Sequence, residues 1–343
     1  MKKLCVLIAL ALVIPVSGFA AKEVVYVFNW SQYIDPAVLK LFEKETGIRV
    51  KYSTFESNEA MFAKIRLVKK AGYDVAFPST YFVERMRRLN MLAPLDKTRL
   101  PNLENLNPDL LDKPYDPGNA YSVPYLWGSS AIGVNAAEID PSSVTSWDDL
   151  WNPAYKGRVL LMDDVRDVFG MALRSLGYSV NETEPGRIEE AYEKLLGLKP
   201  SVKVFNSDSP KQPFLNSEVA IGQIWGGEVY QANEENPDIA YVYPKEGATF
   251  WVDSMVIPAN ARNVNNAHAF IDFMCRPDVA KMNCEYVGYA TANSKAQEML
   301  DEKTRSHKAV YPDKADLDRG EFQADVGEAI MIYEKYWEML KTQ

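Results

Sequence analysis

The chain has 343 residues, more than a single hydrophobic core normally organises and enough for two domains. Apolar residues make up 47% of it, which excludes a generally disordered chain. The formal net charge of −9 argues against nucleic acid or an anionic lipid surface as a partner, and it is compatible with a cationic ligand.

The N-terminus has the pattern of an export signal. Lys2 and Lys3 precede an apolar run from Leu4 to Val16, and small residues follow it. This pattern predicts a secretory signal peptide over residues 1–20, removed on export. The alternative is a membrane anchor, but the run is shorter than the ~20 residues that a spanning helix needs. Without the two lysines the exported chain carries a net charge of −11 (−9 minus 2).

From residue 24 onward, strand and helix patterns alternate. Asp35 and Pro36 are typical of a helix start, with an N-cap followed by proline at the first helical position, and Gly47 is typical of a helix end. The resulting βαβαβ order implies a parallel sheet with right-handed crossovers. The strands are expected at 24–28, 48–52 and 73–77, with helices at 36–46 and 58–70.

The same alternation returns in the second half of the chain. No linker rich in proline, glycine or serine separates the two α/β units, so the sequence predicts two lobes joined by short crossing segments. The elements expected here are helices at 146–151, 167–176 and 185–196, strands at 159–162 and 219–224, and a closing amphipathic helix at 329–340.

Two cysteines remain after the signal peptide, Cys275 and Cys284. An exported protein could join them in a disulfide. Both fall in a helical-looking stretch where free buried thiols are also common, so the sequence leaves both states open.

Enzyme motifs are scarce. His268 and His307 have no zinc-ligand spacing around them, and neither a phosphate-binding loop nor a nucleophile elbow occurs. We therefore expect no metal and no cofactor. A carboxylate-based glycoside hydrolase using Asp164 and Asp253 stays open as an alternative.

Aromatic and acidic residues gather after the predicted strands. In open parallel sheets, ligands bind in the crevice beyond the carboxyl ends of the strands. Each residue alone could be an ordinary core aromatic or a helix cap, but their joint placement favours a binding site. The residues concerned are Trp30, Tyr33, Ser79, Tyr81, Asp163, Asp164, Asp167 and Trp225.

Trp251 and Asp253 form a second element of the candidate site. In an extended strand they point to the same face. An indole ring attracts a cation by ~0.5–2 kcal/mol, and a charge-assisted hydrogen bond adds ~1.5–3 kcal/mol, so this face suits an alkylammonium ion. Aromatic stacking with polar groups also serves sugar binding, which keeps a saccharide as a second ligand class.

The chain resembles the periplasmic spermidine/putrescine-binding proteins of ABC importers over nearly all of its exported part. The matching runs are Asn29-Trp30-Ser31-Gln32-Tyr33, Phe55-Glu56-Ser57-Asn58-Glu59, Pro78-Ser79-Thr80-Tyr81, Val144-Thr145-Ser146-Trp147, Phe250-Trp251-Val252-Asp253-Ser254, Arg276-Pro277-Asp278-Val279-Ala280-Lys281 and Asp325-Val326-Gly327.

The resemblance implies an α/β periplasmic binding protein fold, type II-like, whose two lobes each hold a mixed, mainly parallel sheet flanked by helices. The ligand cleft would lie between the lobes and close on binding. Residues 21–128 and 252–298 would form the first lobe, and residues 129–251 and 299–343 the second. The protein would be a periplasmic monomer without enzymatic activity. It would bind putrescine, spermidine or both and deliver them to an inner-membrane ABC permease.

Carried over by position, the resemblance also implies the cleft residues. Two departures concern selectivity: the family usually has an acid where this chain has Gln32, and some relatives have Glu at Asp167. We expect the third amine of spermidine to be anchored less well here than in those relatives. The alternative function is a polyamine-sensing adaptor that docks on a membrane receptor. The implied cleft residues are Trp30, Ser31, Gln32, Tyr33, Ser79, Tyr81, Asp164, Asp167, Trp225, Trp251, Asp253, Tyr289 and Gln323.

Overall fold

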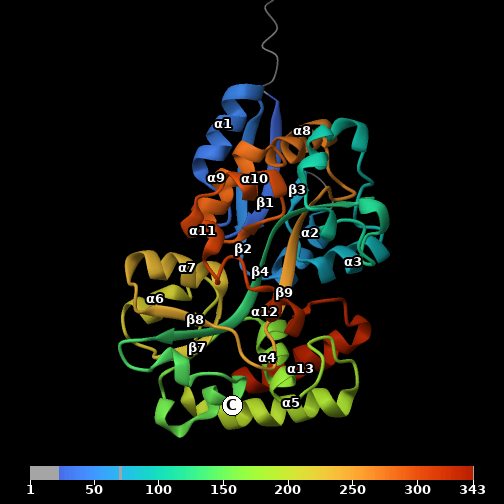
Figure 1. Ribbon diagram of the computed structural model, residues 1–343. Helices are drawn as coiled ribbons and strands as arrows, with labels where there is room; N and C mark the ends of the chain where they lie inside the picture. Colours follow the sequence, from blue (N-terminus) through green and yellow to red (C-terminus); the bar gives the residue numbers. More distant parts are fainter. Residues whose placement is uncertain (1–22, 69–71, 343) are drawn as a thin grey trace, which may run out of the picture.

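The computed structural model describes residues 23–68 and 72–342, and the predicted signal peptide lies outside them. The molecule consists of two α/β lobes, one above the other in Figure 1. Among the described residues, no helix combines the length and the hydropathy needed to cross a bilayer.

The elements expected from the sequence occur in the expected order, with small shifts at their ends, and the structure adds strands and helices that were not expected. The strands are β1 (Val24–Trp30), β2 (Arg49–Phe55), β3 (Val75–Ala76), β4 (Ser122–Asn135), β5 (Val159–Leu161), β6 (Val202–Phe205), β7 (Ile221–Trp225), β8 (Ile239–Val242), β9 (Thr249–Val256), β10 (Ala290–Thr291) and β11 (Glu321–Phe322). The α-helices are α1 (Pro36–Thr46), α2 (Asn58–Leu67), α3 (Thr80–Arg88), α4 (Val165–Ser175), α5 (Pro185–Leu198), α6 (Lys211–Leu215), α7 (Gly226–Glu235), α8 (Val264–Met274), α9 (Pro277–Val287), α10 (Ser294–Met299), α11 (Glu302–Ser306), α12 (Lys314–Arg319) and α13 (Ile330–Thr342).

The first lobe is built on the predicted βαβαβ unit. Strand β1 pairs in parallel with β2 on one side and with β3 on the other. The Asp35 carboxylate accepts a hydrogen bond from the Ala37 amide and so caps α1, which ends at Gly47 with a left-handed φ of 74°. Both signals had been identified in the sequence.

The second lobe repeats this arrangement around β5, which pairs in parallel with β6 and β7. Helix α4 begins at Val165, two residues before the expected start, and Asp164 is its N-cap. The helix expected at 146–151 is a short 3-10 helix over Trp147–Trp151, closed by a capping box between Ser146 and Asp149.

Long antiparallel strands join the two lobes. Strand β4 pairs with β9 along its first part and with β7 further on, and both β4 and β9 run from one lobe into the other (Figure 1). They complete a mixed sheet of 11 strands in which β11 lies parallel beside β9. A short link, with strands crossing between the lobes, was expected from the sequence, but strands of this length were not.

Each lobe has its own hydrophobic core. One contains Val27, Phe42 and Phe270, and another contains Phe169 and Tyr333. Cys275 and Cys284 are both buried and free, which resolves the open question about a disulfide.

Candidate ligand-binding site

A cavity lies where the two lobes meet, and residues of both lobes line it. Every cleft residue implied by the resemblance lines it. The lining residues are Trp30, Ser31, Gln32, Tyr33, Phe55, Glu56, Asn58, Ser79, Tyr81, Asp164, Asp167, Ser207, Asp208, Trp225, Glu228, Gln231, Trp251, Asp253, Val287, Tyr289 and Gln323.

The end of β1 supplies one wall of the cavity. The Trp30 indole Nε1 donates a 2.9 Å hydrogen bond to the carbonyl of Phe77, which ties the two strand ends together. Gln32 follows in a left-handed turn with φ 51°, and its side chain is exposed at the cavity. The Tyr33 ring is buried, and its hydroxyl lies close to the Asp253 carboxylate.

Asp253 belongs to a buried polar cluster of the first lobe. The Ser79 hydroxyl donates to Asp253 Oδ1 at 2.6 Å. Asn58, the first residue of α2, donates to both the Ser79 hydroxyl and the Tyr81 hydroxyl at 3.0 Å. These bonds fix the orientation of the carboxylate before any ligand arrives.

The start of α4 supplies two carboxylates from the second lobe. Asp164 Oδ1 accepts hydrogen bonds from the amides of Arg166 (2.9 Å) and Asp167 (3.0 Å), so it caps the helix and lines the cavity at once. Asp167 accepts from the Trp225 indole at 2.6 Å through Oδ2. Its Oδ1 accepts from the Ser130 hydroxyl at 2.9 Å.

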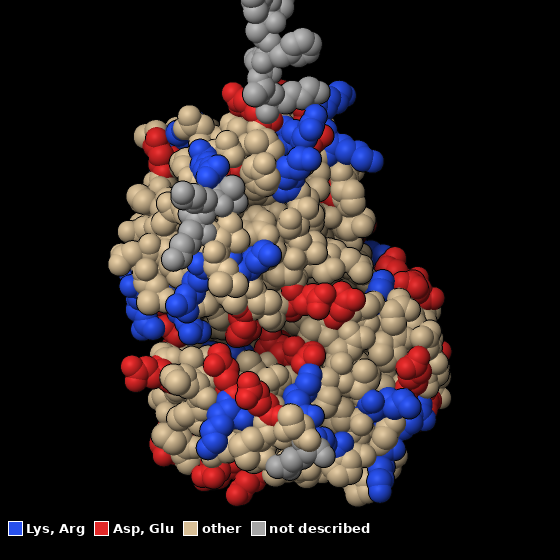
Figure 2. Space-filling model, turned by 180° about the vertical axis from the view of Figure 1, so that it is seen from behind, with Lys and Arg blue, Asp and Glu red and all other residues tan. Residues whose placement is uncertain are grey.

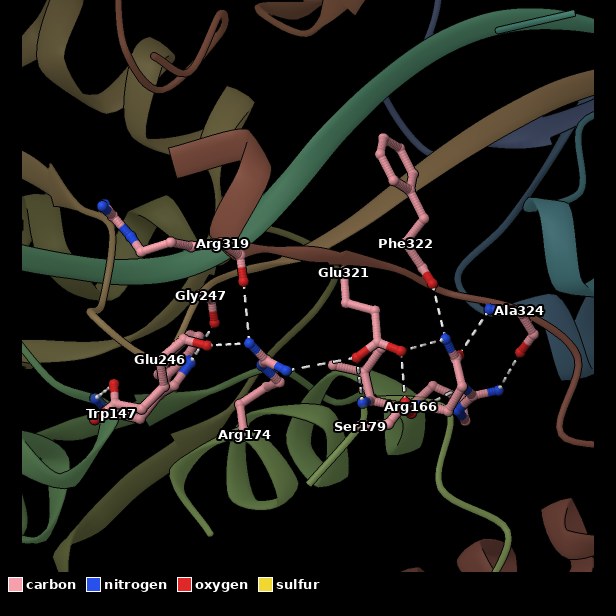
Figure 3. A network of polar contacts seen from close by, with 12 residues as sticks. Trp147, Arg166, Arg174, Ser179, Glu246, Gly247, Arg319, Glu321, Phe322 and Ala324 are labelled. Carbon is pink, nitrogen blue, oxygen red and sulfur yellow. Dashed lines mark hydrogen bonds and ion pairs between the residues drawn. The ribbon is translucent and has the colours of Figure 1, made fainter. Parts of the chain in front are cut away.

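Gln323, in the segment that follows β11, also contacts the Asp167 carboxylate. Its Nε2 donates a hydrogen bond to Asp167 Oδ1 at 3.2 Å. Figure 3 shows the polar network that holds this segment against the second lobe. The Glu321 carboxylate accepts from the Val180 amide at 3.0 Å, and the buried Arg166 guanidinium donates to the Ala324 carbonyl at 3.2 Å. The network therefore fixes Gln323 and the start of α4 as one rigid wall.

Aromatic side chains cover the third side. The Trp251 and Tyr289 ring centroids lie 5.1 Å apart, and those of Tyr33 and Tyr289 lie 5.6 Å apart. Gly128 and Gly227 let these rings approach the backbone: a Cβ at Gly128 would come within 2.6 Å of Trp251, and one at Gly227 within 2.5 Å of Tyr289. The indole Nε1 of Trp251 is buried without a hydrogen-bond partner in the protein.

The cavity is strongly acidic. Among the described residues, no lysine or arginine lines it, whereas six carboxylates do: Glu56, Asp164, Asp167, Asp208, Glu228 and Asp253. Figure 2 shows Asp and Glu side chains gathered along the groove between the two lobes. Carboxylates that line a cavity without a basic side chain in the same lining favour a positively charged ligand.

Burial is the main electrostatic influence on these acids. It raises the pKa of Asp253 to about 7, although the Ser79 hydrogen bond opposes the shift. Burial and, next, the neighbouring Asp164 raise the pKa of Asp167 to about 7. The pKa of Asp164 is itself raised by burial. Each of these carboxyl groups therefore holds its proton more tightly than a carboxyl in water.

Several lining residues were not expected from the sequence. Phe55 ends β2, and Asn58 and Glu56 lie in the Phe55–Glu59 run that carried the resemblance, so a signal was available for these. Glu228 follows β7 as Trp225 does, and the same strand-end argument would have found it. The others had no signal in the sequence: Ser207 and Asp208 lie in the loop after β6, Gln231 lies in α7, and Val287 ends α9.

Two lobes, an interlobe cavity and a set of buried carboxylates define the class of a solute-binding protein for cations. The chain belongs to the family described as bacterial extracellular solute-binding protein, which matches residues 37–311. This is a family of substrate-binding proteins rather than enzymes, so the glycoside hydrolase alternative is wrong.

The chain is similar to characterised relatives over almost its whole length. It is 50% identical over 334 residues to the spermidine/putrescine-binding periplasmic protein of Escherichia coli K12, covering 97% of this chain and 96% of the relative. It is 43% identical to spermidine/putrescine-binding periplasmic protein 1 of Haemophilus influenzae, covering 94% and 90%. The solved structure of a putative spermidine/putrescine ABC transporter from Listeria monocytogenes superposes with a TM-score of 0.89 at 39% identity, covering 93% of this chain and 99% of that one.

Proposed function

We propose that this protein binds a polyamine, putrescine or spermidine, in the interlobe cavity and delivers it to an inner-membrane ABC permease. The observation that supports this best is the lining of the cavity, which among the described residues combines six carboxylates with aromatic walls and no basic side chain. The names of the relatives point to the same ligand class.

The proposed contacts follow from the chemistry of the ligand. Each ammonium group needs a carboxylate or strong acceptors, because an unpaired charge in a desolvated cleft is costly. Asp253 serves one end of the ligand, and Asp164 and Asp167 serve the other. The rings of Trp251 and Tyr289 cover the methylene groups between the amines, each worth ~0.8 kcal/mol when buried. A saccharide has no charge to offset these carboxylates, which makes it the weaker candidate.

The binding cycle that we propose is a closing of the two lobes around the ligand. Residues 21–128 and 252–298 form one rigid body, and residues 129–251 and 299–343 form the other. The hinge lies where β4 and β9 pass between the two lobes. These strands pair with each other, so closure bends a paired segment and does not swing the lobes on a loose linker.

Three further features belong to the proposal. Residues 1–20 are removed on export to the periplasm, the mature protein is a monomer, and the closed form docks on the permease. The adaptor alternative would use the same cavity, but the relatives are named as binding proteins and transporter components, which gives it no support.

Native mass spectrometry of freshly purified protein tests the ligand class directly, because a tightly bound polyamine stays on the protein during purification. The protein is then unfolded and refolded to remove any bound ligand. Calorimetric titration of the refolded protein with putrescine and with spermidine measures the affinity for each. The uncharged 1,4-butanediol is the matched control, since it has the same carbon chain as putrescine without the charge. Binding of butanediol as tightly as putrescine, or no binding of either polyamine, would refute the proposal.

A further inference from the structure

Glu228 is a cavity carboxylate that neither the sequence patterns nor the resemblance assigned to the site. It lies in the first turn of α7, three residues after Trp225 at the end of β7. Burial raises the pKa of Glu228 to about 7, although Lys211 opposes the shift. Among the described residues it has no salt-bridge partner within 4.0 Å, and the Lys211 ammonium instead donates to Gln231 and Glu235.

Tyr289 connects Glu228 to the opposite wall of the cavity. Its ring lies against the backbone of Gly227, the residue before Glu228. On its other side the ring contacts Tyr33, the residue after Gln32, at 5.6 Å between centroids. Burial and, next, the charge of Glu228 raise the pKa of Tyr289, so Glu228 lies near this aromatic side chain, and both Glu228 and Gln32 line the cavity.

A hydrogen bond close to Glu228 holds helix α7 in place. The Gln231 side chain, one turn further along α7, donates a 2.8 Å hydrogen bond to the Val287 carbonyl, and Val287 also lines the cavity. This bond fixes α7 against the segment that carries Tyr289. Asp208 approaches from a separate loop and adds a second negative charge beside Glu228.

Gln32 supplies an amide and no charge on its side of the cavity. Asp253, Asp164 and Asp167 serve two ammonium groups in the binding mode proposed above, which leaves a third ammonium without a carboxylate. Since Glu228 is the remaining enclosed carboxylate beside the aromatic wall, it can receive that group from the second lobe.

We propose that Glu228 is a specificity-determining residue that pairs with the third ammonium group of a triamine, in place of an acid at position 32. This inference rests on the proposed polyamine function and refines it. It makes the protein a spermidine binder despite Gln32, whereas the missing acid at that position led us to expect weaker anchoring of the third amine of spermidine.

The test compares two ligands on charge-matched variants. Glu228→Gln removes the carboxylate with little change in shape, and Glu234→Gln makes the same change on the same helix at an exposed position outside the cavity. Calorimetry should show that Glu228→Gln weakens spermidine ~10-fold or more and putrescine less than about threefold, since one charge-assisted hydrogen bond is lost for the triamine alone. Glu234→Gln should leave both affinities within about twofold.

A rescue variant makes the assignment sharper. In the Glu228→Gln background, Gln32→Glu should restore most of the spermidine affinity, because it returns a carboxylate to the lining of the same cavity. An equal loss for both ligands, or no loss for either, would overturn the inference while leaving polyamine binding intact. If the wild type binds neither polyamine, the proposed function itself fails. If Glu228→Gln does not fold, Glu228→Asp with its shorter arm should show the same selective loss in weaker form.

Discussion

Ser79 donates a 2.6 Å hydrogen bond to Asp253 across 174 residues of sequence, and the two residues also pair as an isolated antiparallel bridge. The bond occupies Oδ1 of a carboxylate that is 4% exposed and lines the cavity. Because Ser79 lies at the start of α3 and Asp253 in β9, the cluster forms only when the first lobe is fully folded. Preorganisation of this kind reduces the cost of binding a ligand.

Asp253 should be the most costly single residue to lose. The change Asp253→Asn keeps the shape and removes the charge that would pair with an ammonium group, and the loss of one partner of a buried pair typically costs ~2–5 kcal/mol. Calorimetry with putrescine measures it, and Asp238→Asn at an exposed position is the control. A loss below about threefold would contradict the assignment.

Trp251 should be next in importance, through its ring rather than its indole nitrogen. Trp251→Ala removes the aromatic face and should weaken polyamine binding by ~1–3 kcal/mol, combining cation–π attraction and methylene burial. Trp251→Phe keeps a ring and should lose less. Melting temperatures are needed for both variants, because a buried Trp→Ala change typically costs ~3–5 kcal/mol of stability. Equal affinities of the two variants would show that the ring itself is not used.

Polyamine affinity should depend on pH, because burial raises the pKa of both Asp253 and Asp167 to about 7. A carboxyl with a raised pKa contributes stability to the ligand-free folded protein at pH values below its unfolded pKa of ~4, and this contribution is lost as the pH rises towards 7. Above this range both groups are charged and need a cation. Ammonium binding favours the charged form, so it should release protons between about pH 4 and 7.

The measurement is a calorimetric titration at about pH 5.5 and pH 8, repeated in buffers of different ionisation enthalpy. Affinity should be ~10-fold or more lower at the acidic pH, since each unit below a pKa costs ~1.4 kcal/mol. Affinity that stays the same at both values, with no proton release, would show that these carboxyls remain charged in the free protein.

Lobe closure should be visible in solution. Small-angle scattering should give a smaller radius of gyration when saturating putrescine is added, because the cavity draws residues from both lobes and closure brings them together. Asp253→Asn, at a putrescine concentration that saturates only the wild type, is the control and should stay expanded. An unchanged radius at saturation would contradict the hinge proposal.

Export processing is checked by N-terminal sequencing of protein from the periplasm. The mature chain should begin near Ala21, because the charged start and apolar run of residues 1–20 are typical of a cleaved signal. Retention of Met1 in a membrane fraction would favour the anchor instead.

Local patterns in the sequence determined most of the first lobe. The N-cap at Asp35, the stop at Gly47 and the apolar strand patterns all act over a few residues, so they are visible without the fold. The position of aromatic and acidic residues after strands likewise indicated a cleft. The particular residues at its centre, such as Gln323 and Tyr289, came from the resemblance and not from any local pattern.

The tertiary structure alone decided how these groups act together. The Asp253 carboxylate has its neighbours because Ser79 and Asn58 arrive from other elements, and Gln323 reaches Asp167 because the network around Glu321 holds its segment in place. The Tyr289 ring packs against the backbone of Gly227, and this packing brings the neighbouring Glu228 to the cavity. The sequence gives each side chain and its local backbone preference. Burial, and pairing between residues far apart in the chain, depend on how distant segments pack. Burial and pairing in turn set the pKa values of the carboxyl groups and the choice of ligand.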